Sequence, residues 1–192
     1  MSFFHSESDL KFEFPADWVV VRYDDGAMHS SLNKALSAKG TGVKGVDFIA
    51  LTAEGDVLLL EIKNFRGYRI ENKIRLTQSK LAEEISWKVF DTLGGVISEL
   101  HARGHTSELG KAGRAVSKKC RLFVVAWIEG DDEPNGGSGW VVEMESQRTQ
   151  LDKKISPWLH AAHVVVVDTE RARKFPVLRA IEVERLPRRR ID

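Results

Sequence analysis

The chain has 192 residues, 42% of them hydrophobic and 30% charged, with a formal net charge of +1 at pH 7. These values are ordinary for a soluble globular protein, and the length is sufficient for one α/β domain with a substantial core. No stretch approaches the length of a membrane-spanning apolar helix, and the N-terminus becomes acidic too early for a signal peptide. The single cysteine, Cys120, excludes an intramolecular disulfide and fits a reducing cytoplasm.

The first part of the chain predicts a strand, a helix and a hairpin. Residues 17–23 form an apolar run that is typical of a buried strand. A short helix follows and ends at Gly40. Its apolar stripe comprises Met28, Leu32 and Ala35 or Leu36. Two β-rich runs, 46–52 and 57–63, flank turn-forming residues at 53–56, which predicts a β-hairpin.

Helices and strands alternate in the second part of the chain. A long helix begins at Thr77 or Ser79 and runs to about Leu100, because its apolar residues recur at helical spacing. A basic loop then leads to a strand at 120–128, a helix at 143–155, a strand at 163–168 and a last edge strand at 177–184. This order indicates an α/β fold, in which helices flank a mixed central sheet.

Three ionisable residues, Asp47, Glu61 and Lys63, lie at the ends of the two hairpin strands. Residues 57–63 are apolar enough to form a central buried strand, where an unpaired charge is costly. Glu61 and Lys63 are two residues apart and therefore point to the same face of the sheet. A hard divalent cation explains the grouping, because Mg²⁺ binds one or two carboxylates together with water and phosphate oxygens.

The register of the hairpin decides whether Asp47 reaches that face. A two-residue turn would direct Asp47 to the opposite face of the sheet. A three-residue turn over residues 54–56 pairs Asp47 with Lys63 and makes Asp47 a diagonal neighbour of Glu61. We therefore predict the three-residue turn, or a compensating bulge, with Asp47 and Glu61 on one face.

This hairpin resembles the core motif of the PD-(D/E)xK, or restriction-endonuclease-like, nucleases. The match is Asp47, thirteen intervening residues and then Glu61-Ile62-Lys63, with Val46 where the motif usually has proline. A broader likeness to small stand-alone prokaryotic members covers roughly residues 17–128. The resemblance implies an αβββαβ core and a Mg²⁺ site, for which Mn²⁺ is expected to substitute. By resemblance, Asp47, Glu61 and the backbone carbonyl of Ile62 bind the metal, while Lys63 orients or activates the attacking water and steadies the developing charge.

The resemblance also points to residues outside the hairpin. Family members often carry an acid on the first helix, which here is Asp24 or Asp25, although either residue also suits a helix N-cap. Some relatives carry a glutamine after the hairpin, and Gln78 fits that place as well as it fits an exposed surface position. The following helix has a polar stripe that either lines the cleft or faces solvent, formed by Glu84, Lys88 and Asp91.

Basic residues are unevenly distributed along the chain, and this can produce a basic face on a near-neutral protein. The residues expected to contact nucleic acid are Lys44, Arg66, Gln78, Lys88, Lys111, Arg114, Lys118 and Lys119. Solvated loops and a frayed basic tail would produce the same pattern, so both interpretations stay open.

Most tryptophans are expected in the core. Trp18, Trp87, Trp127 and Trp158 lie among apolar residues. Trp140 stands beside a glycine-rich loop and is the candidate for stacking on a base. Cys120 borders an apolar run and is interpreted as a buried structural thiol.

These features predict a single domain over residues 1–192, with a core at about 17–128, a C-terminal extension at about 129–186 and a basic tail at 187–192. The predicted activity is metal-dependent hydrolysis of phosphodiester bonds in a nucleic acid, with DNA favoured, in the cytoplasm and without a membrane partner. One alternative is a nuclease-like binding or regulatory module without turnover. Another is an interaction protein whose catalytic face is covered by a partner or a second copy, so a homodimer also stays open.

Overall fold

The computed structural model describes residues 3–24, 44–67, 79–131 and 138–187. Its centre is a five-stranded sheet in the order β3-β4-β5-β6-β7. The strands are β3 (Val19–Arg22), β4 (Phe48–Leu51), β5 (Val57–Asn64), β6 (Leu122–Glu129) and β7 (Ala162–Val167). Neighbours from β3 to β5 are antiparallel and neighbours from β5 to β7 are parallel. The α/β class and the mixed central sheet predicted from the sequence are therefore confirmed.

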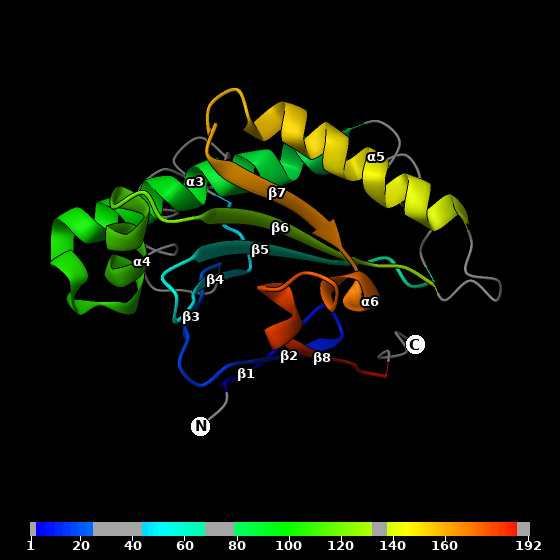
Figure 1. Ribbon diagram of the computed structural model, residues 1–192, viewed down its shortest axis with the longest axis horizontal. Helices are drawn as coiled ribbons and strands as arrows, with labels where there is room; N and C mark the ends of the chain where they lie inside the picture. The colour runs from blue at the N-terminus through cyan, green and yellow to red at the C-terminus, as the bar shows by residue number, and fades with distance from the viewer. Residues whose placement is uncertain (1–2, 25–43, 68–78, 132–137, 188–192) are drawn as a thin grey trace.

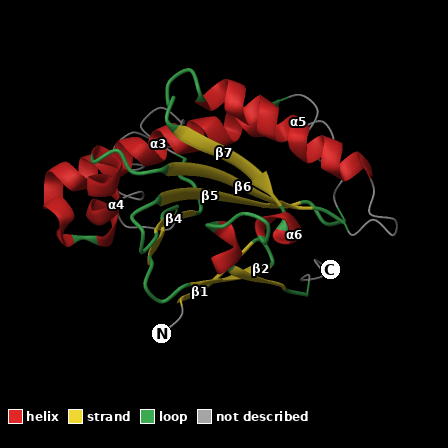
Figure 2. Ribbon diagram, viewed as in Figure 1, coloured by secondary structure: helices red, strands yellow, loops and turns green. Residues whose placement is uncertain are grey.

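Two different layers cover the sheet. Figure 1 shows helices on one face and a smaller sheet with short helices on the other, and Figure 2 shows the same layers by element type. The helices are α3 (Lys80–Arg103), α4 (Glu108–Ser117) and α5 (Ser138–Ile155). The small antiparallel sheet has the order β1-β2-β8 and contains β1 (Phe3–Glu7), β2 (Leu10–Phe14) and β8 (Glu182–Arg185). The short helices on that side are α6 (Thr169–Ala172) and η3 (Leu178–Ala180), whereas η2 (Gly104–Thr106) joins α3 to α4.

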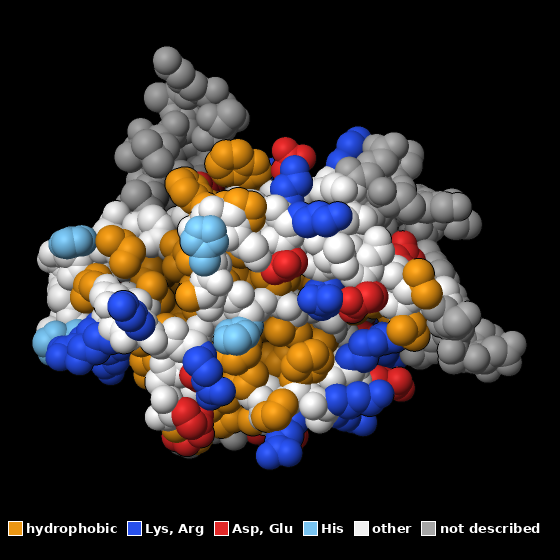
Figure 3. Space-filling model, turned by 45° about the horizontal axis from the view of Figure 1, so that its top comes forward, with side chains coloured by type: hydrophobic (Ala, Val, Ile, Leu, Met, Phe, Trp, Pro, Cys, Tyr) orange, Lys and Arg blue, Asp and Glu red, His pale blue; other side chains and the backbone are white. Residues whose placement is uncertain are grey.

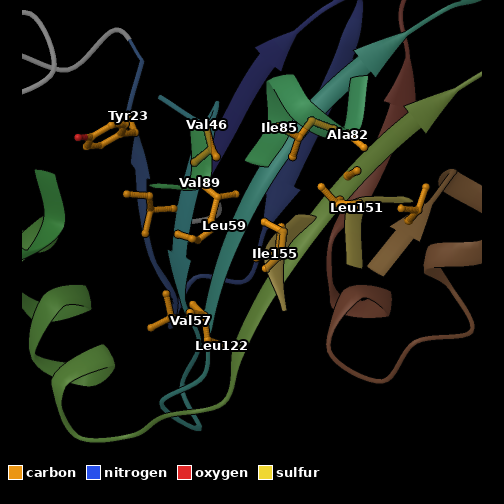
Figure 4. Close-up of a cluster of buried hydrophobic side chains, with 14 of the residues drawn as sticks. Tyr23, Val46, Val57, Leu59, Ala82, Ile85, Val89, Leu122, Leu151 and Ile155 are labelled. Carbon is orange, nitrogen blue, oxygen red and sulfur yellow. The ribbon is translucent and has the colours of Figure 1, made fainter. Parts of the chain in front are cut away.

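Strand β5 is buried on both faces because successive side chains point to opposite sides of the sheet. Leu58, Leu60 and Ile62 pack in the cluster shared with the small sheet. Leu59 packs in the other cluster, with residues of α3 and α5, as the close-up in Figure 4 shows. Glu61 and Lys63 have the same parity as Leu59, so their side chains leave the strand on the face covered by α3.

The segment before β6 differs from the sequence-based prediction. It was expected to be a basic loop, but residues 108–117 form α4. The Ser107 side chain accepts a hydrogen bond from the Gly110 amide and caps the first turn. A Cβ on Gly113 would lie 2.9 Å from the Val96 carbonyl oxygen, so a glycine permits the close approach of α4 to α3.

The small sheet was also missed. Ser8 and Asp9 both have positive φ angles, 52° and 58°, which is the two-residue turn favoured in tight hairpins. The edge strand expected at 177–184 is shorter than predicted: the strand is β8, and it pairs with β2 rather than with the central sheet. The helix expected after residue 23 lies outside the described residues, except for Asp24.

Candidate functional site

The turn of the β4–β5 hairpin differs from the prediction by one residue. Leu51 pairs with Val57, and Thr52 donates its amide to the Asp56 carbonyl at 2.9 Å. The three turn residues are therefore 53–55, with Gly55 at φ 88°, and not 54–56. Asp56 is held at the strand end because its amide donates to Thr52 Oγ1 and its carboxylate accepts from the Arg121 guanidinium.

This register brings the two predicted metal ligands directly opposite each other. Phe48 pairs with Leu60. In this antiparallel pair the residue before Phe48 is opposite the residue after Leu60, so Asp47 is opposite Glu61 rather than diagonal to it. The Lys88 ammonium on α3 lies 2.7 Å from Glu61 Oε1 and 4.0 Å from Asp47 Oδ1. Asp47 and Glu61 therefore share the face covered by α3, as expected, although the predicted diagonal pairing was wrong.

Glu61 is buried but incompletely satisfied. Its side chain is 1% exposed. Oε1 accepts from Lys88 and lies 2.8 Å from the Lys63 ammonium. Among the described residues, Oε2 has no hydrogen-bond partner. A buried carboxylate oxygen without a partner loses its hydration without replacement, so this atom is where a bound cation would lower the free energy most.

Asp47 has an unusual proton affinity. The pKa of Asp47 is raised from 3.8 to about 7, mainly by burial and secondly by the Glu61 carboxylate. The Ile62 amide, which donates to Asp47 Oδ2 at 2.6 Å, and the Lys88 ammonium act in the opposite direction. Titration near neutrality in a buried acid is typical of functional sites.

Lys63 is paired on two sides. Its ammonium lies 2.8 Å from Glu61 Oε1 and 3.0 Å from Glu84 Oε1. Burial alone would lower the pKa of Lys63, but Glu61 and Glu84 outweigh it and the pKa is raised. Lys63 is therefore a cation at neutral pH. The polar stripe of α3 faces the site at Glu84 and Lys88, so the cleft-lining interpretation fits these two residues.

A second acidic group adjoins Asp47. Carboxylate oxygens of Glu7, Asp24 and Asp47 lie within 4.8 Å of one another. Arg22 approaches two of these acids, at 2.9 Å from Glu7 and 3.9 Å from Asp24. Sequence reasoning had proposed Asp24 but missed Glu7, because the strand that carries Glu7 was not recognised. The alternation of Leu10, Phe12 and Phe14 was the available signal, since all three are buried in β2.

The backbone at Ile62 also faces Asp47. Val57 donates to the Arg121 carbonyl and Phe65 to the Glu129 carbonyl, so the odd-numbered residues of β5 bond to β6. Ile62 belongs to the other set, and its amide donates to Asp47. The Ile62 carbonyl therefore does not bond to β6. It lies on the β4 edge of β5, where it was predicted to serve as a metal ligand.

The other predicted contacts are dispersed. Asp25 and Gln78 lie outside the described residues. Lys44 is exposed and its amide donates to Asp91, while Arg66 is tied to Asn64 and to the Asp9 carbonyl. The basic residues of the segment before β6 are Lys111, Arg114, Lys118 and Lys119, all exposed. They lie towards the start of β5, roughly 13 Å along the strand from Glu61 at about 3.3 Å per residue.

Two tryptophans expected in the core are on the surface. Trp87 is 59% exposed and Trp158 is 37% exposed, whereas Trp18 and Trp127 are buried as predicted. Trp140, the predicted stacking residue, is half-buried, and its indole nitrogen donates to Asp168. Its ring packs over Gly130, so Trp140 has a structural role here.

Cys120 is half-buried rather than fully buried, and burial raises the pKa of its thiol. A thiol with a raised pKa is a poor nucleophile at neutral pH, which agrees with the structural role predicted from the sequence.

Comparison with known proteins found no matching family model, curated protein or solved structure. Among the described helices, none has both the length and the apolar character needed to cross a lipid bilayer.

Proposed function

We propose that the protein is a Mg²⁺-dependent phosphodiesterase acting on nucleic acid, with its active site at Asp47, Glu61 and Lys63. The observation that carries the proposal is the pair of buried carboxylates opposite each other, one with a pKa near 7 and the other with an oxygen that has no partner in the described part of the chain. The antiparallel meander β3-β4-β5, followed by β6 parallel to β5, supports a restriction-endonuclease-like core.

The donor set suits a hard divalent cation, which prefers carboxylate, carbonyl and water oxygens. Asp47 and Glu61 Oε2 would hold the ion, and Asp24 and Glu7, whose carboxylate oxygens lie within 4.8 Å of one of Asp47, could contribute.

A divalent ion at this place would lower the pKa of bound water and offset negative charge on the phosphate. The role of Lys63 follows from its ion pairs. Because its pKa is raised, the lysine is protonated at neutral pH and does not take a proton from water. It can instead orient the water and stabilise charge on the phosphate oxygens. Lys88 acts on Glu61, which it holds through a 2.7 Å hydrogen bond.

The test is cleavage of supercoiled plasmid and of single-stranded DNA and RNA at pH 8 with Mg²⁺ or Mn²⁺. Asp47→Asn and Lys63→Ala should each reduce the rate by about 100-fold or more, and EDTA should abolish it. Lys11→Ala is the matched control, since Lys11 is a lysine on the small sheet paired with Glu184. Cleavage that survives Asp47→Asn, or that is equally lost in Lys11→Ala, would remove these residues from the mechanism.

One observation favours a second function, a nucleic-acid-binding module without turnover. The Lys88 ammonium already lies between Asp47 and Glu61, where it supplies positive charge that an ion would otherwise supply. Calorimetry separates the two functions. Absence of Mg²⁺ and Mn²⁺ binding at pH 8, together with salt-sensitive binding to DNA, would favour the module.

A further inference from the structure

Three aromatic side chains form a continuous exposed group on the helical layer. Trp87 and Phe90 of α3 are 59% and 55% exposed, and Trp158 after α5 is 37% exposed. Their ring centroids are 6.1 Å apart from Trp87 to Phe90 and 5.6 Å from Phe90 to Trp158, with interplanar angles of 85° and 79°. Figure 3 views the molecule from this side, and hydrophobic side chains gather near its upper edge. We call these three residues the aromatic platform.

Helical spacing relates the platform to the candidate active site. Successive residues of a helix are about 100° apart, so Trp87 lies one step around α3 from Lys88, which contacts Glu61. Phe90 lies farther around α3 in the same direction. The ring of Trp158, just after α5, contacts the ring of Phe90. A chain-like ligand that extends from Glu61 around the outer side of α3 would therefore meet Trp87 first and the other two rings next.

The platform is held in place and flanked by cations. The indole nitrogen of Trp158 donates to the Lys154 carbonyl at 2.8 Å, which fixes this ring against the end of α5. The side chain of Lys154 is exposed. Lys80, also exposed, lies seven residues before Trp87 and so on the same side of α3. The exposed acid Glu83 lies between Lys80 and Trp87 on this side of α3, so the rings rather than the lysines carry the case for a nucleic-acid ligand.

The exposed area argues against a second copy of the chain as the occupant. Aromatic side chains bury roughly 200 Å² each when covered, so these exposed fractions leave on the order of 300 Å² open. A stable interface between two copies requires about 800 Å² on each partner. A few bases match the smaller area.

We propose that the aromatic platform stacks unpaired bases and makes single-stranded nucleic acid, or a frayed end, the preferred substrate. The proposal rests on the proposed function, since the scissile phosphate is placed at Glu61. Paired bases in a duplex are stacked on one another and do not offer their faces to Trp87 or Phe90. The rings read no base identity, because every base has a π-face, so the preference concerns strandedness and not sequence.

The experiment is fluorescence anisotropy with a labelled oligothymidine and with a blunt duplex of equal length, in EDTA so that no cleavage occurs. Trp87→Ala and Phe90→Ala should each weaken binding to oligothymidine by about 5- to 100-fold and leave duplex binding within twofold. Trp87→Tyr should retain most of the affinity. Phe4→Ala is the matched control, because Phe4 is 54% exposed on β1, outside the platform.

Equal effects of Trp87→Ala on both ligands, or no effect on either, would overturn the platform. So would light scattering that shows a dimer separated into monomers by Trp87→Ala, because the rings would then form an interface between copies. The binding assay is independent of turnover. Loss of oligothymidine binding in Trp87→Ala with no cleavage of any substrate by the wild type would retain the platform and refute the nuclease, whereas cleavage without a Trp87 effect would do the reverse.

Discussion

Replacing Asp47 by asparagine should stabilise the metal-free protein at pH 8. Burial and Glu61 raise the pKa of Asp47 from 3.8 to about 7, so the folded state binds the proton more tightly than the unfolded state does. Stability is therefore lost as the pH rises from about 4 to about 7, and the loss is complete above pH 7. At 1.36 kcal/mol per pKa unit, the shift corresponds to about 4 kcal/mol.

Asparagine removes this cost while keeping the shape of the side chain. Its carbonyl oxygen can still accept from the Ile62 amide, and Lys88 keeps its bond to Glu61. The gain from Asp47→Asn should be near zero at pH 4, should grow through pH 7 and should then remain constant, with a rise in Tm on the order of 10 °C at pH 8.

Urea and thermal unfolding in EDTA from pH 4 to pH 8.5 measure this gain. Asp56→Asn is the matched control, because Asp56 is an equally buried acid of the same hairpin but is paired with Arg121. This substitution should lower stability at pH 8. An Asp47→Asn protein that is no more stable than the wild type at pH 8, or whose gain is independent of pH, would refute the reasoning.

Four further predictions follow from the structure. Mg²⁺ at about 100 times its Kd should stabilise the wild type by about 3 kcal/mol in thermal unfolding at pH 8, clearly less at pH 6 where Asp47 is protonated, and not at all in Asp47→Asn. Glu61→Gln should lower the pKa of Asp47, since Glu61 raises it, and carboxyl NMR titration should place that pKa below 7. Gly113→Ala should destabilise the protein by about 1–3 kcal/mol in urea unfolding, because the new Cβ would meet the Val96 carbonyl. Gly94→Ala should instead stabilise it by up to about 1 kcal/mol, since nothing lies within 4 Å of that position.

The part of the candidate site that lies within one hairpin could be predicted from the sequence. The apolar run of β5 and the charges at its end place Glu61 and Lys63 on one face by strand alternation alone. The turn was predicted one residue too late, and the pairing therefore two residues off, because both depend on Asp56, whose position is set by Arg121, sixty-five residues away in the chain. Contacts between segments so far apart have no local signal.

Two other errors have different physical causes. Glu7 was missed because β1 was not recognised and because its approach to Asp47 joins segments far apart in the chain. Trp87, in contrast, was within reach of sequence reasoning. It stands two residues from both Ile85 and Val89, which are buried, and two residues on a helix correspond to about 200°. The helical spacing therefore places Trp87 on the outer side of α3, although its neighbours in the sequence are apolar.

The protein itself contains a comparison that bears on Glu61. Glu129 lies on β6, the neighbouring strand, and is also completely buried. Both of its carboxylate oxygens are satisfied: Oε1 accepts from the Trp127 indole and from the Thr169 amide and hydroxyl, and Oε2 accepts from Arg185. The fold can thus fully partner a buried carboxylate at this end of the sheet, yet Glu61 Oε2 has no partner among the described residues. Of these two carboxylates in adjacent strands, the one with the open oxygen is opposite Asp47. An atom left in that state costs stability, which is the expected signature of a group whose partner is a ligand rather than another part of the chain.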